Sequence, residues 1–149
     1  MTLDKIDKKI IEILSEDGRI SYVDLAEKVG LSRVAVKDRI QSLMDKGIIE
    51  KFTIVVNSEK AGKQISAFFE VEVEPIRLQQ VAQNLAANPN VASIYQMTGP
   101  STLHMHVLVE DMKMLESFIN EELYSVKGIH KIESSIILKR FKSRNGYKL

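Results

Sequence analysis

The sequence has 149 residues, which is enough for one ordinary domain or two small ones. Apolar residues make up 44% and charged residues 28%, with a net charge of +1, and this profile excludes disordered and fibrous chains. Cysteine is absent, which excludes disulfide bonds and thiolate metal sites. No apolar run reaches the roughly 18 residues of a membrane span, and the charged first residues lack a signal-peptide core. We therefore expect a cytoplasmic protein without membrane contact.

Residues 1–50 have the periodicity of three short helices. In the first helix, apolar residues recur at spacings of three and four, at Leu3, Ile6, Ile10, Ile13 and Leu14. Asp17-Gly18 ends this helix. Ser21 is a suitable N-cap for the second helix, and Gly30 ends it.

The second and third helices fit a helix-turn-helix unit. Ala26 supplies a small side chain where the helix axes cross, and Gly30 allows the positive φ that the turn needs. The third helix, capped by Ser32, has an apolar stripe at Val36, Ile40 and Leu43. If this stripe is buried, the residues turned outward are Ser32, Arg33, Val34, Lys37 and Asp38. A recognition helix turns these positions to base edges in the major groove of DNA.

The residue types in and around this helix suit DNA. Arg33 can donate two hydrogen bonds to a guanine, and Ser21, Ser32 and the helix N-termini can hold phosphates. Four further side chains can neutralise phosphates, namely Lys37, Arg39, Lys46 and Lys51. The alternative is that these charges form the solvated face of a packed helix, but the combination of helix, turn and cap favours DNA binding.

The pattern changes after Gly47. Apolar residues alternate over residues 49–57, which predicts a strand, and the polar segment that follows suits a hinge. We therefore divide the chain into a helix-turn-helix domain (1–50), a strand and hinge (51–63), a second domain (64–142) and a basic tail (143–149).

The second domain alternates strands and helices. The predicted elements are strand 65–73, helix 78–87, strand 91–98, strand 102–109, helix 112–123 and strand 128–139. This order is that of a ferredoxin-like βαββαβ unit, an antiparallel sheet with both helices on one face, so the fold class is α+β with a winged-type helix-turn-helix domain in front. No helix is left to cover the second sheet face, so we expect that face to meet another subunit.

Several motifs resemble the Lrp/AsnC family of "feast/famine" transcription regulators. The most specific are "DGRIS", "LAEKVGLS" and the spacing R-x-x-x-L-x-x-x-G-I-I in residues 39–49, and the resemblance runs nearly end to end. It implies dimers formed through the sheet, commonly assembled into tetramers or octamers. It also implies that a small effector, often an amino acid, binds near the turn between the second and third strands of the sheet.

The resemblance places functional residues on this sequence. The family's recognition helix falls on residues 32–46, and its recurrent helix arginine falls on Arg39, as a phosphate contact or a helix-packing ion pair. The effector turn falls on Thr98, Gly99, Pro100, Ser101 and Thr102. Both acidic residues of the family's turn are missing here, and with them the group that would take an α-ammonium. Ser134 is a further candidate for lining an effector pocket.

Two histidines and two glutamates on neighbouring predicted strands are candidates for a further site. His104 and His106 share one strand face, as do Glu70 and Glu72 on the neighbouring strand. A zinc site is one reading, but a stripe of cross-strand His–Glu pairs is the favoured one. A tetrapyrrole decarboxylase on a similar fold, using His104 and Arg77, and a stand-alone effector-sensing assembly module are the alternative functions.

The sequence thus predicts a homo-oligomeric regulator that binds double-stranded DNA at a pseudo-palindromic site. No catalytic grouping or phosphate-binding glycine loop is present, so we predict neither an enzyme nor a metal or cofactor. A small-molecule effector such as an amino acid is the remaining expected partner.

Overall fold

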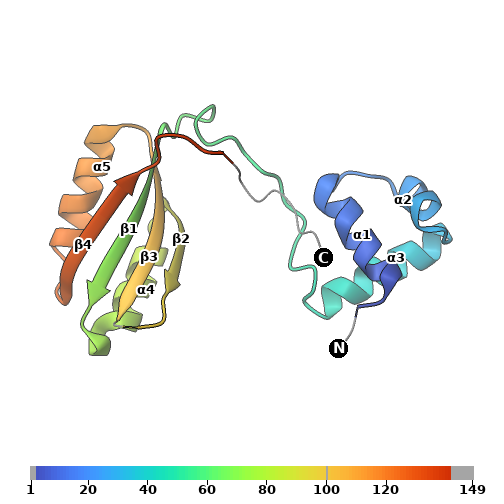
Figure 1. Ribbon diagram of the computed structural model, residues 1–149, viewed down its shortest axis with the longest axis horizontal. Coiled ribbons are helices and arrows are strands. Elements are labelled where there is room, and N and C mark those ends of the chain that lie inside the picture. The colour runs from blue at the N-terminus through green and yellow to red at the C-terminus, as the bar shows by residue number, and fades with distance from the viewer. Residues whose placement is uncertain (1–2, 100, 142–149) are drawn as a thin grey trace. The chain divides into compact units, whose positions relative to one another are not determined.

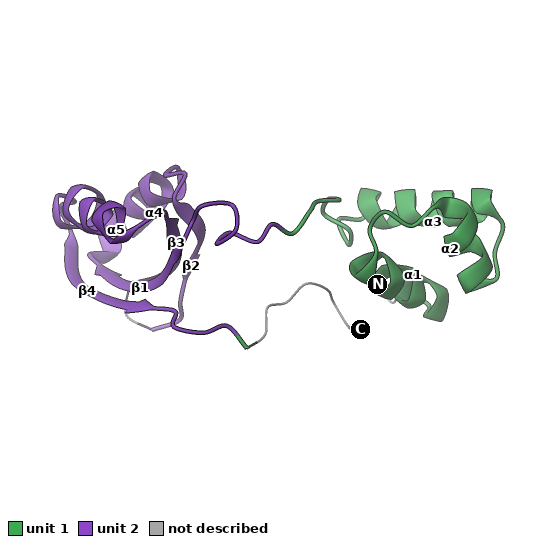
Figure 2. Ribbon diagram, turned by 90° about the horizontal axis from the view of Figure 1, so that it is seen from above, with its two compact units in different colours: residues 1–55, 141–149 green, residues 56–140 purple. Residues whose placement is uncertain are grey.

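The computed structural model describes residues 3–99 and 101–141. The chain divides into two compact units, one made of residues 1–55 with 141–149 and one made of residues 56–140 (Figure 2). No helix within the described residues combines the length and apolar character needed to cross a membrane.

The first unit consists of three helices, α1 (Lys5–Glu16), α2 (Tyr22–Val29) and α3 (Arg33–Asp45) (Figure 1). Each begins at a residue whose side chain accepts a hydrogen bond from the first turn, which satisfies a backbone N–H that has no partner within the helix. The buried core of this unit is Ile10, Leu25, Ala26, Val36, Ile40 and Leu43. The predicted three-helix pattern is confirmed.

The turn between α2 and α3 depends on Gly30. This residue has φ of 72°, in the left-handed region that favours glycine. Its position lets the Leu31 backbone N–H donate to the Ala26 carbonyl at 3.0 Å. The chain therefore ends α2 and begins α3 within three residues, as the sequence predicts.

The predicted strand over residues 49–57 is absent. Residues 50–57 have no regular secondary structure, although their apolar side chains at Phe52, Ile54 and Val56 are exposed. A strand is stabilised by hydrogen bonds to a neighbouring strand, and no described segment of the chain pairs with this one. The alternating pattern is present, but no segment among residues 3–99 and 101–141 supplies the partner that a strand needs. The predicted strand is therefore wrong for this part of the chain.

The second unit is a four-stranded antiparallel sheet with helices on one face (Figures 1 and 2). Its elements are β1 (Ile65–Val73), α4 (Leu78–Ala86), β2 (Val91–Gln96), β3 (Thr102–Val109), α5 (Met112–Phe118) and β4 (Ile129–Ile136). A 3-10 turn (Pro75–Arg77) precedes α4, and a π-helical segment (Ile119–Tyr124) follows α5. The strand order β2-β3-β1-β4 confirms the ferredoxin-like βαββαβ fold.

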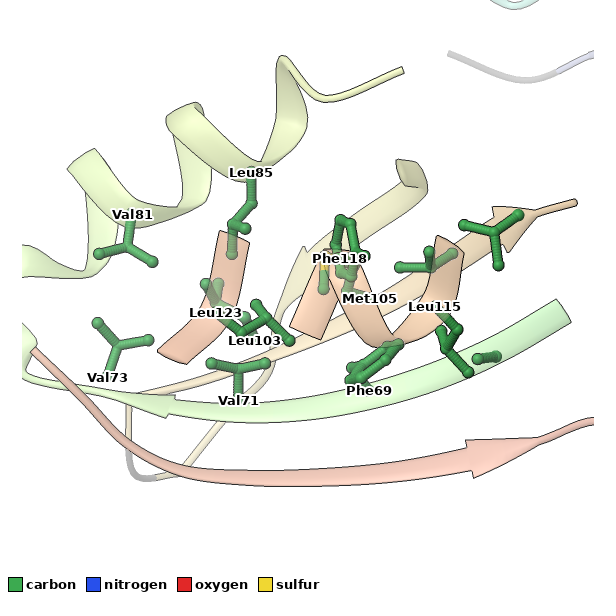
Figure 3. Close-up of a cluster of buried hydrophobic side chains, with 13 residues drawn as sticks. Phe69, Val71, Val73, Val81, Leu85, Leu103, Met105, Leu115, Phe118 and Leu123 are labelled. Carbon is green, nitrogen blue, oxygen red and sulfur yellow. The ribbon is translucent and has the colours of Figure 1, made fainter. Parts of the chain in front are cut away.

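The core of this unit lies between the sheet and the two helices. Figure 3 shows Phe69 and Val71 of β1 beneath Val81 and Leu85 of α4, with Phe118 of α5 beside them. The alternate residues of β1 point to the opposite face of the sheet. Burial therefore alternates along β1, and one of its faces is left without a helix.

Two strands are shorter than predicted. β2 ends at Gln96 because the Met97 N–H donates to the Thr102 carbonyl at 3.0 Å and begins the turn to β3. β4 ends at Ile136, which pairs with Ala67 near the start of β1. Beyond that point β1 offers few residues to pair with, so the predicted extension to residue 139 does not form.

Candidate DNA interface and effector turn

The first turn of α3 presents a continuous outward surface. Its buried stripe is the predicted one, and all five residues predicted to face outward are exposed, namely Ser32, Arg33, Val34, Lys37 and Asp38. Val34 is 67% exposed although it is apolar and β-branched. The helix therefore combines a packed face with a mixed cationic and apolar face that nothing within the described residues covers.

The charges on this surface are unpaired. Within the described residues, neither Arg33 nor Lys37 takes part in an ion pair or a side-chain hydrogen bond. Lys46 and Lys51 are likewise exposed and unpaired there. Four cations on one unit are thus available for an anionic partner.

The two serine caps differ in what their hydroxyl groups do. Ser32 Oγ accepts from the Ala35 N–H at 3.1 Å, and no bond within the described part of the chain uses its hydrogen. Ser21 Oγ accepts from the Asp24 N–H at 3.1 Å and donates to Asp24 Oδ2 at 2.7 Å. Ser32 is therefore better placed than Ser21 to donate to a phosphate, because the Asp24 carboxylate lies beside Ser21.

Arg39, unlike the other predicted cationic DNA contacts, forms ion pairs within its own unit. Its Nη1 lies 2.7 Å from Asp4 Oδ2 and 2.7 Å from Asp7 Oδ1. Of the two roles that the sequence left open for Arg39, the structure shows the helix-packing ion pair. The sequence analysis did not identify Asp4 and Asp7, although acidic residues three apart before an apolar helix are the signal of a capping box.

The predicted effector turn is tied to the sheet. Gly99 has φ of 113°, and the Val73 N–H donates to the Ser101 carbonyl at 2.8 Å. Thr98 is exposed and Thr102 is half-buried at the start of β3. Pro100 lies outside the described residues, as does the tail from residue 142 onward.

Ser134 is not close to this turn within one chain. It is exposed on β4, where it pairs with Phe69 of β1. The turn instead contacts Val73, four residues further along β1. At about 3.3 Å per residue this is a separation of roughly 13 Å along the strand. A single site holding both would need a second chain.

The sheet face without helices carries the two histidines. His104 pairs with Glu70, and His106 Nε2 lies 2.6 Å from Ser66 Oγ while its ring stacks on Phe68 at 4.6 Å. Burial, with a smaller effect of Arg140, lowers the pKa of His106. One of the predicted cross-strand His–Glu pairs, His104 with Glu70, is therefore present, whereas His106 contacts Ser66 and Phe68 in place of a glutamate. Within the described residues, no three His, Cys, Asp or Glu side chains are grouped to hold a metal ion.

Exposed aromatic side chains share this face. Phe68 is 49% exposed and Tyr95 is 63% exposed. Tyr95 pairs with His104 across β2 and β3, and Phe68 pairs with His106 across β1 and β3, so these residues form neighbouring rows. The sequence analysis did not single out Tyr95, because the register of β2 against β3 is not visible in a single strand.

Family models match both units. Residues 3–50 match a winged helix-turn-helix DNA-binding model, and residues 66–147 match the Lrp/AsnC ligand binding domain. Within residues 3–55 the structure describes three helices and no strand, so these residues contain no counterpart of the wing.

Relatives extend over nearly the whole chain. An uncharacterized HTH-type transcriptional regulator of Pyrococcus horikoshii is 38% identical over 135 residues, covering 91% of this chain and 85% of that protein. The HTH-type transcriptional regulator LrpA of the same organism is 33% identical over 140 residues, covering 94% of this chain and 99% of that protein.

Solved structures show the same fold. The transcriptional regulator NMB0573 from Neisseria meningitidis, in complex with L-Met, has a TM-score of 0.92 and 29% identity, covering 98% of this chain and 96% of that chain. AsnC of Escherichia coli has a TM-score of 0.89 at 21% identity, covering 97% of both chains. These relatives are regulators, so they give the decarboxylase alternative no support. The chain belongs to the Lrp/AsnC family of transcription regulators, with a helix-turn-helix DNA-binding domain and an Lrp/AsnC ligand binding domain.

Proposed function

We propose that the protein reads a specific DNA sequence with the first turn of α3 lying in the major groove. The observation that carries this proposal is the exposure of Arg33, Val34, Lys37 and Asp38 while the opposite stripe of α3 is buried. Phosphates can bind these exposed cations at little cost in free energy, because the cations have no internal ion pair that binding would have to break.

The exposed residues suit different parts of the DNA. The Arg33 guanidinium matches the two acceptors of guanine, and the methyl groups of Val34 suit the methyl group of thymine. Lys37, Lys46 and Lys51 are point charges that fit phosphates, with Ser32 as a hydroxyl donor. Specificity therefore resides mainly in Arg33 and Val34, and the salt-dependent affinity resides in the lysines.

The helix-free sheet face supports self-association. It presents Phe68 and Tyr95 to solvent, and exposed aromatic groups in neighbouring rows are typical of a surface that meets a partner. We propose that a second copy of the chain packs on this face in a two-fold dimer. The exposed apolar residues of segment 52–56 give the second copy a further surface to cover. Association of dimers into tetramers or octamers, which the family resemblance implies, is part of this proposal.

A two-fold dimer presents two copies of α3 to DNA. The binding site is then a pseudo-palindrome, with half-sites about one or two helical turns apart, near 10 bp per turn. A DNA-binding role places the protein in the compartment that holds the genome, which agrees with the cytoplasmic location that the sequence predicts.

We further propose that a small effector binds at the turn formed by residues 98–102. The complex of the Neisseria relative with L-Met supports the binding of a small effector by a chain of this fold. The turn offers the hydroxyl groups of Thr98, Ser101 and Thr102 and no acidic side chain. Such donors fit a carboxylate better than an ammonium group. An effector that binds here would change DNA affinity through the assembly.

Selection of bound sequences from random double-stranded DNA, with and without a panel of amino acids, tests this function. We expect one enriched pseudo-palindrome, and we expect Arg33→Ala to lose preference at one base pair per half-site, worth about 1–3 kcal/mol. Lys113→Ala is the matched control, because Lys113 is an exposed, unpaired cation on α5 of the other unit. No enrichment at low salt would instead support an effector-sensing module that does not bind DNA.

A further inference from the structure

Arg39 links the middle of α3 to the beginning of α1. A single nitrogen, Nη1, is 2.7 Å from Asp4 Oδ2 and 2.7 Å from Asp7 Oδ1. The Arg39 side chain is 34% exposed and that of Asp7 is 20% exposed. Asp4 is more open to water, with 50% of its side chain exposed, so Asp7 is the better shielded of the two carboxylates.

The same two carboxylates begin α1. Asp4 Oδ1 accepts from the Asp7 N–H at 2.7 Å, and Asp7 Oδ2 accepts from the Asp4 N–H at 3.3 Å. This is a reciprocal capping box. One oxygen of each carboxylate therefore caps α1, and the other holds Arg39 of α3. A substitution of Asp4 or Asp7 therefore affects both the N-terminal cap of α1 and the ion pair that joins α1 to α3.

The charge-assisted hydrogen bonds of Arg39 are directional, whereas the apolar contacts between the helices are not. The burial of Ile10, Val36 and Ile40 holds the helices together, but the hydrophobic effect is not directional. Hydrogen bonds between ionised groups constrain both distance and angle. The pKa of Asp4 is lowered, first by the Asp7 backbone N–H and then by the Arg39 guanidinium, and the two carboxylates raise the pKa of Arg39. Both shifts favour the charged forms that these bonds need.

Two acidic groups surround one cation. A DNA phosphate approaching Arg39 would meet the carboxylates of Asp4 and Asp7 as well, and like charges repel. This distinguishes Arg39 from Arg33 and Lys37, which have no acidic partner within the described residues.

From this geometry we infer that Arg39 is a positioning residue for DNA recognition. It fixes the angle of α3 against α1 through Asp4 and Asp7, so that the first turn of α3 is presented to the groove in one orientation, and it does not contact a phosphate. The inference rests on the proposed DNA binding and assigns Asp4 and Asp7 a part in it.

The two roles of Arg39 predict opposite changes in DNA affinity when an acidic charge next to it is removed. If Arg39 contacted a phosphate, Asp7→Asn would release Arg39, reduce repulsion and raise DNA affinity. Under positioning, Asp7→Asn lowers affinity by about threefold to tenfold for all sequences alike, because α3 loses its fixed angle. Glu12→Gln is the matched control, since Glu12 is an exposed, unpaired acid of α1 within the described residues, and it leaves affinity unchanged or slightly raised.

Salt dependence gives a second readout. Arg39→Gln lowers affinity but leaves the slope of log affinity against log salt unchanged, whereas loss of a phosphate contact reduces the slope by about 0.9. The double variant Asp7→Asn with Arg39→Gln binds no more weakly than Arg39→Gln alone, because both changes break the same link. Circular dichroism at the assay temperature confirms that each variant is folded, and Asp7→Asn supports or overturns the inference by sign even where Arg39→Gln fails to fold.

A measurement without DNA keeps this inference separate from the proposed function. NMR titration of the Asp4 carboxyl group should give a lowered pKa in the parent protein and a higher one in Arg39→Gln. DNA binding by the parent protein is the test of the proposed function. With that binding intact, higher affinity of Asp7→Asn, a reduced salt slope of Arg39→Gln, or an unchanged Asp4 titration would overturn the positioning role.

Discussion

The two units of the chain are stabilised in different ways. Among the described residues, the helix-turn-helix unit has six buried core residues and the sheet unit has thirteen. A small core leaves little free energy in reserve, and the first unit adds side-chain caps on all three helices and the ion pairs of Arg39. The sheet unit buries one face of its sheet under α4 and α5 and leaves the other face open.

This difference separates what each unit offers to partners. In the first unit the proposed contact surface is one turn of α3, a helix that is joined to α1 by the ion pairs of Arg39. In the second unit it is a broad sheet face with aromatic groups, whose position depends on the packed core behind it. Substitutions should therefore affect the first unit through caps and turns and the second through packing.

The largest effect is expected in β1, where neighbouring phenylalanines point to opposite faces. Phe69 is buried and Phe68 is half-exposed. Phe69→Ala should lower the free energy of unfolding of the sheet unit by about 3–5 kcal/mol, whereas Phe68→Ala should cost about 0.2–1 kcal/mol. Urea unfolding at low protein concentration measures both. Equal losses would show that the two faces do not differ as described.

For self-association we expect the exposed Phe68 to matter more than the buried Phe69. Phe68→Glu should abolish dimerisation in sedimentation experiments, because it buries a charge in the proposed interface, while the sheet unit remains folded. A dimer that persists in Phe68→Glu would place the interface elsewhere.

The next effect concerns the turn of the first unit. Gly30→Ala should destabilise this unit by about 1–2 kcal/mol, because φ of 72° is unfavourable for a residue with a Cβ atom. A Cβ atom there would have no neighbour within 4 Å, so the loss measures backbone conformation alone. Gly18→Ala is the control, since Gly18 has no positive φ, and its effect should stay within about 0.5 kcal/mol. Thermal unfolding compares the two, and equal shifts would contradict the role of Gly30.

A smaller effect is expected from the cap of α3. Ser32→Ala should lower stability by about 1 kcal/mol, because the Ala35 N–H loses its acceptor. Ser32→Thr should restore most of it. Amide hydrogen exchange in the first turn of α3 reports the change locally, and unchanged exchange in Ser32→Ala would show that water replaces the cap at no cost.

The smallest effect is a pH dependence of the first unit. The pKa of Asp4 is lowered in the folded protein from its ordinary 3.8, so the stability it contributes is complete above that value and is lost as pH falls through the lowered pKa. The difference in unfolding temperature between the parent and Asp4→Asn should therefore be constant near neutral pH and disappear in strong acid. Asn retains a cap acceptor, and a constant difference across the acid range would exclude the charge as its origin.

Much of the fold could be predicted from the sequence because its signals are local. Caps at Ser21 and Ser32, the glycine at 30 and the apolar stripe of α3 each depend on residues within a few positions, and the structure has them as predicted. The order of strands and helices likewise gave the βαββαβ topology, because few arrangements satisfy it.

The features that could not be predicted involve partners that are distant in sequence or that lie outside the described residues. The alternation in residues 49–57 predicts a strand, but no described segment pairs with it. Arg39 was assigned two roles, and only its distance to Asp4 and Asp7 distinguishes them. Ser134 and the turn at 98–102 were both predicted to line an effector site, and the register of β4 against β1 separates them within one chain.

The most direct test of the proposed DNA interface is the salt dependence of DNA binding by Lys37→Ala. Because Lys37 is exposed and unpaired on α3, its loss should weaken binding to all sequences alike and reduce the slope of log affinity against log salt by about 0.9. Lys113→Ala on α5 should leave both affinity and slope unchanged. An unchanged slope in Lys37→Ala, or an equal loss in Lys113→Ala, would contradict the assignment of this helix face to DNA.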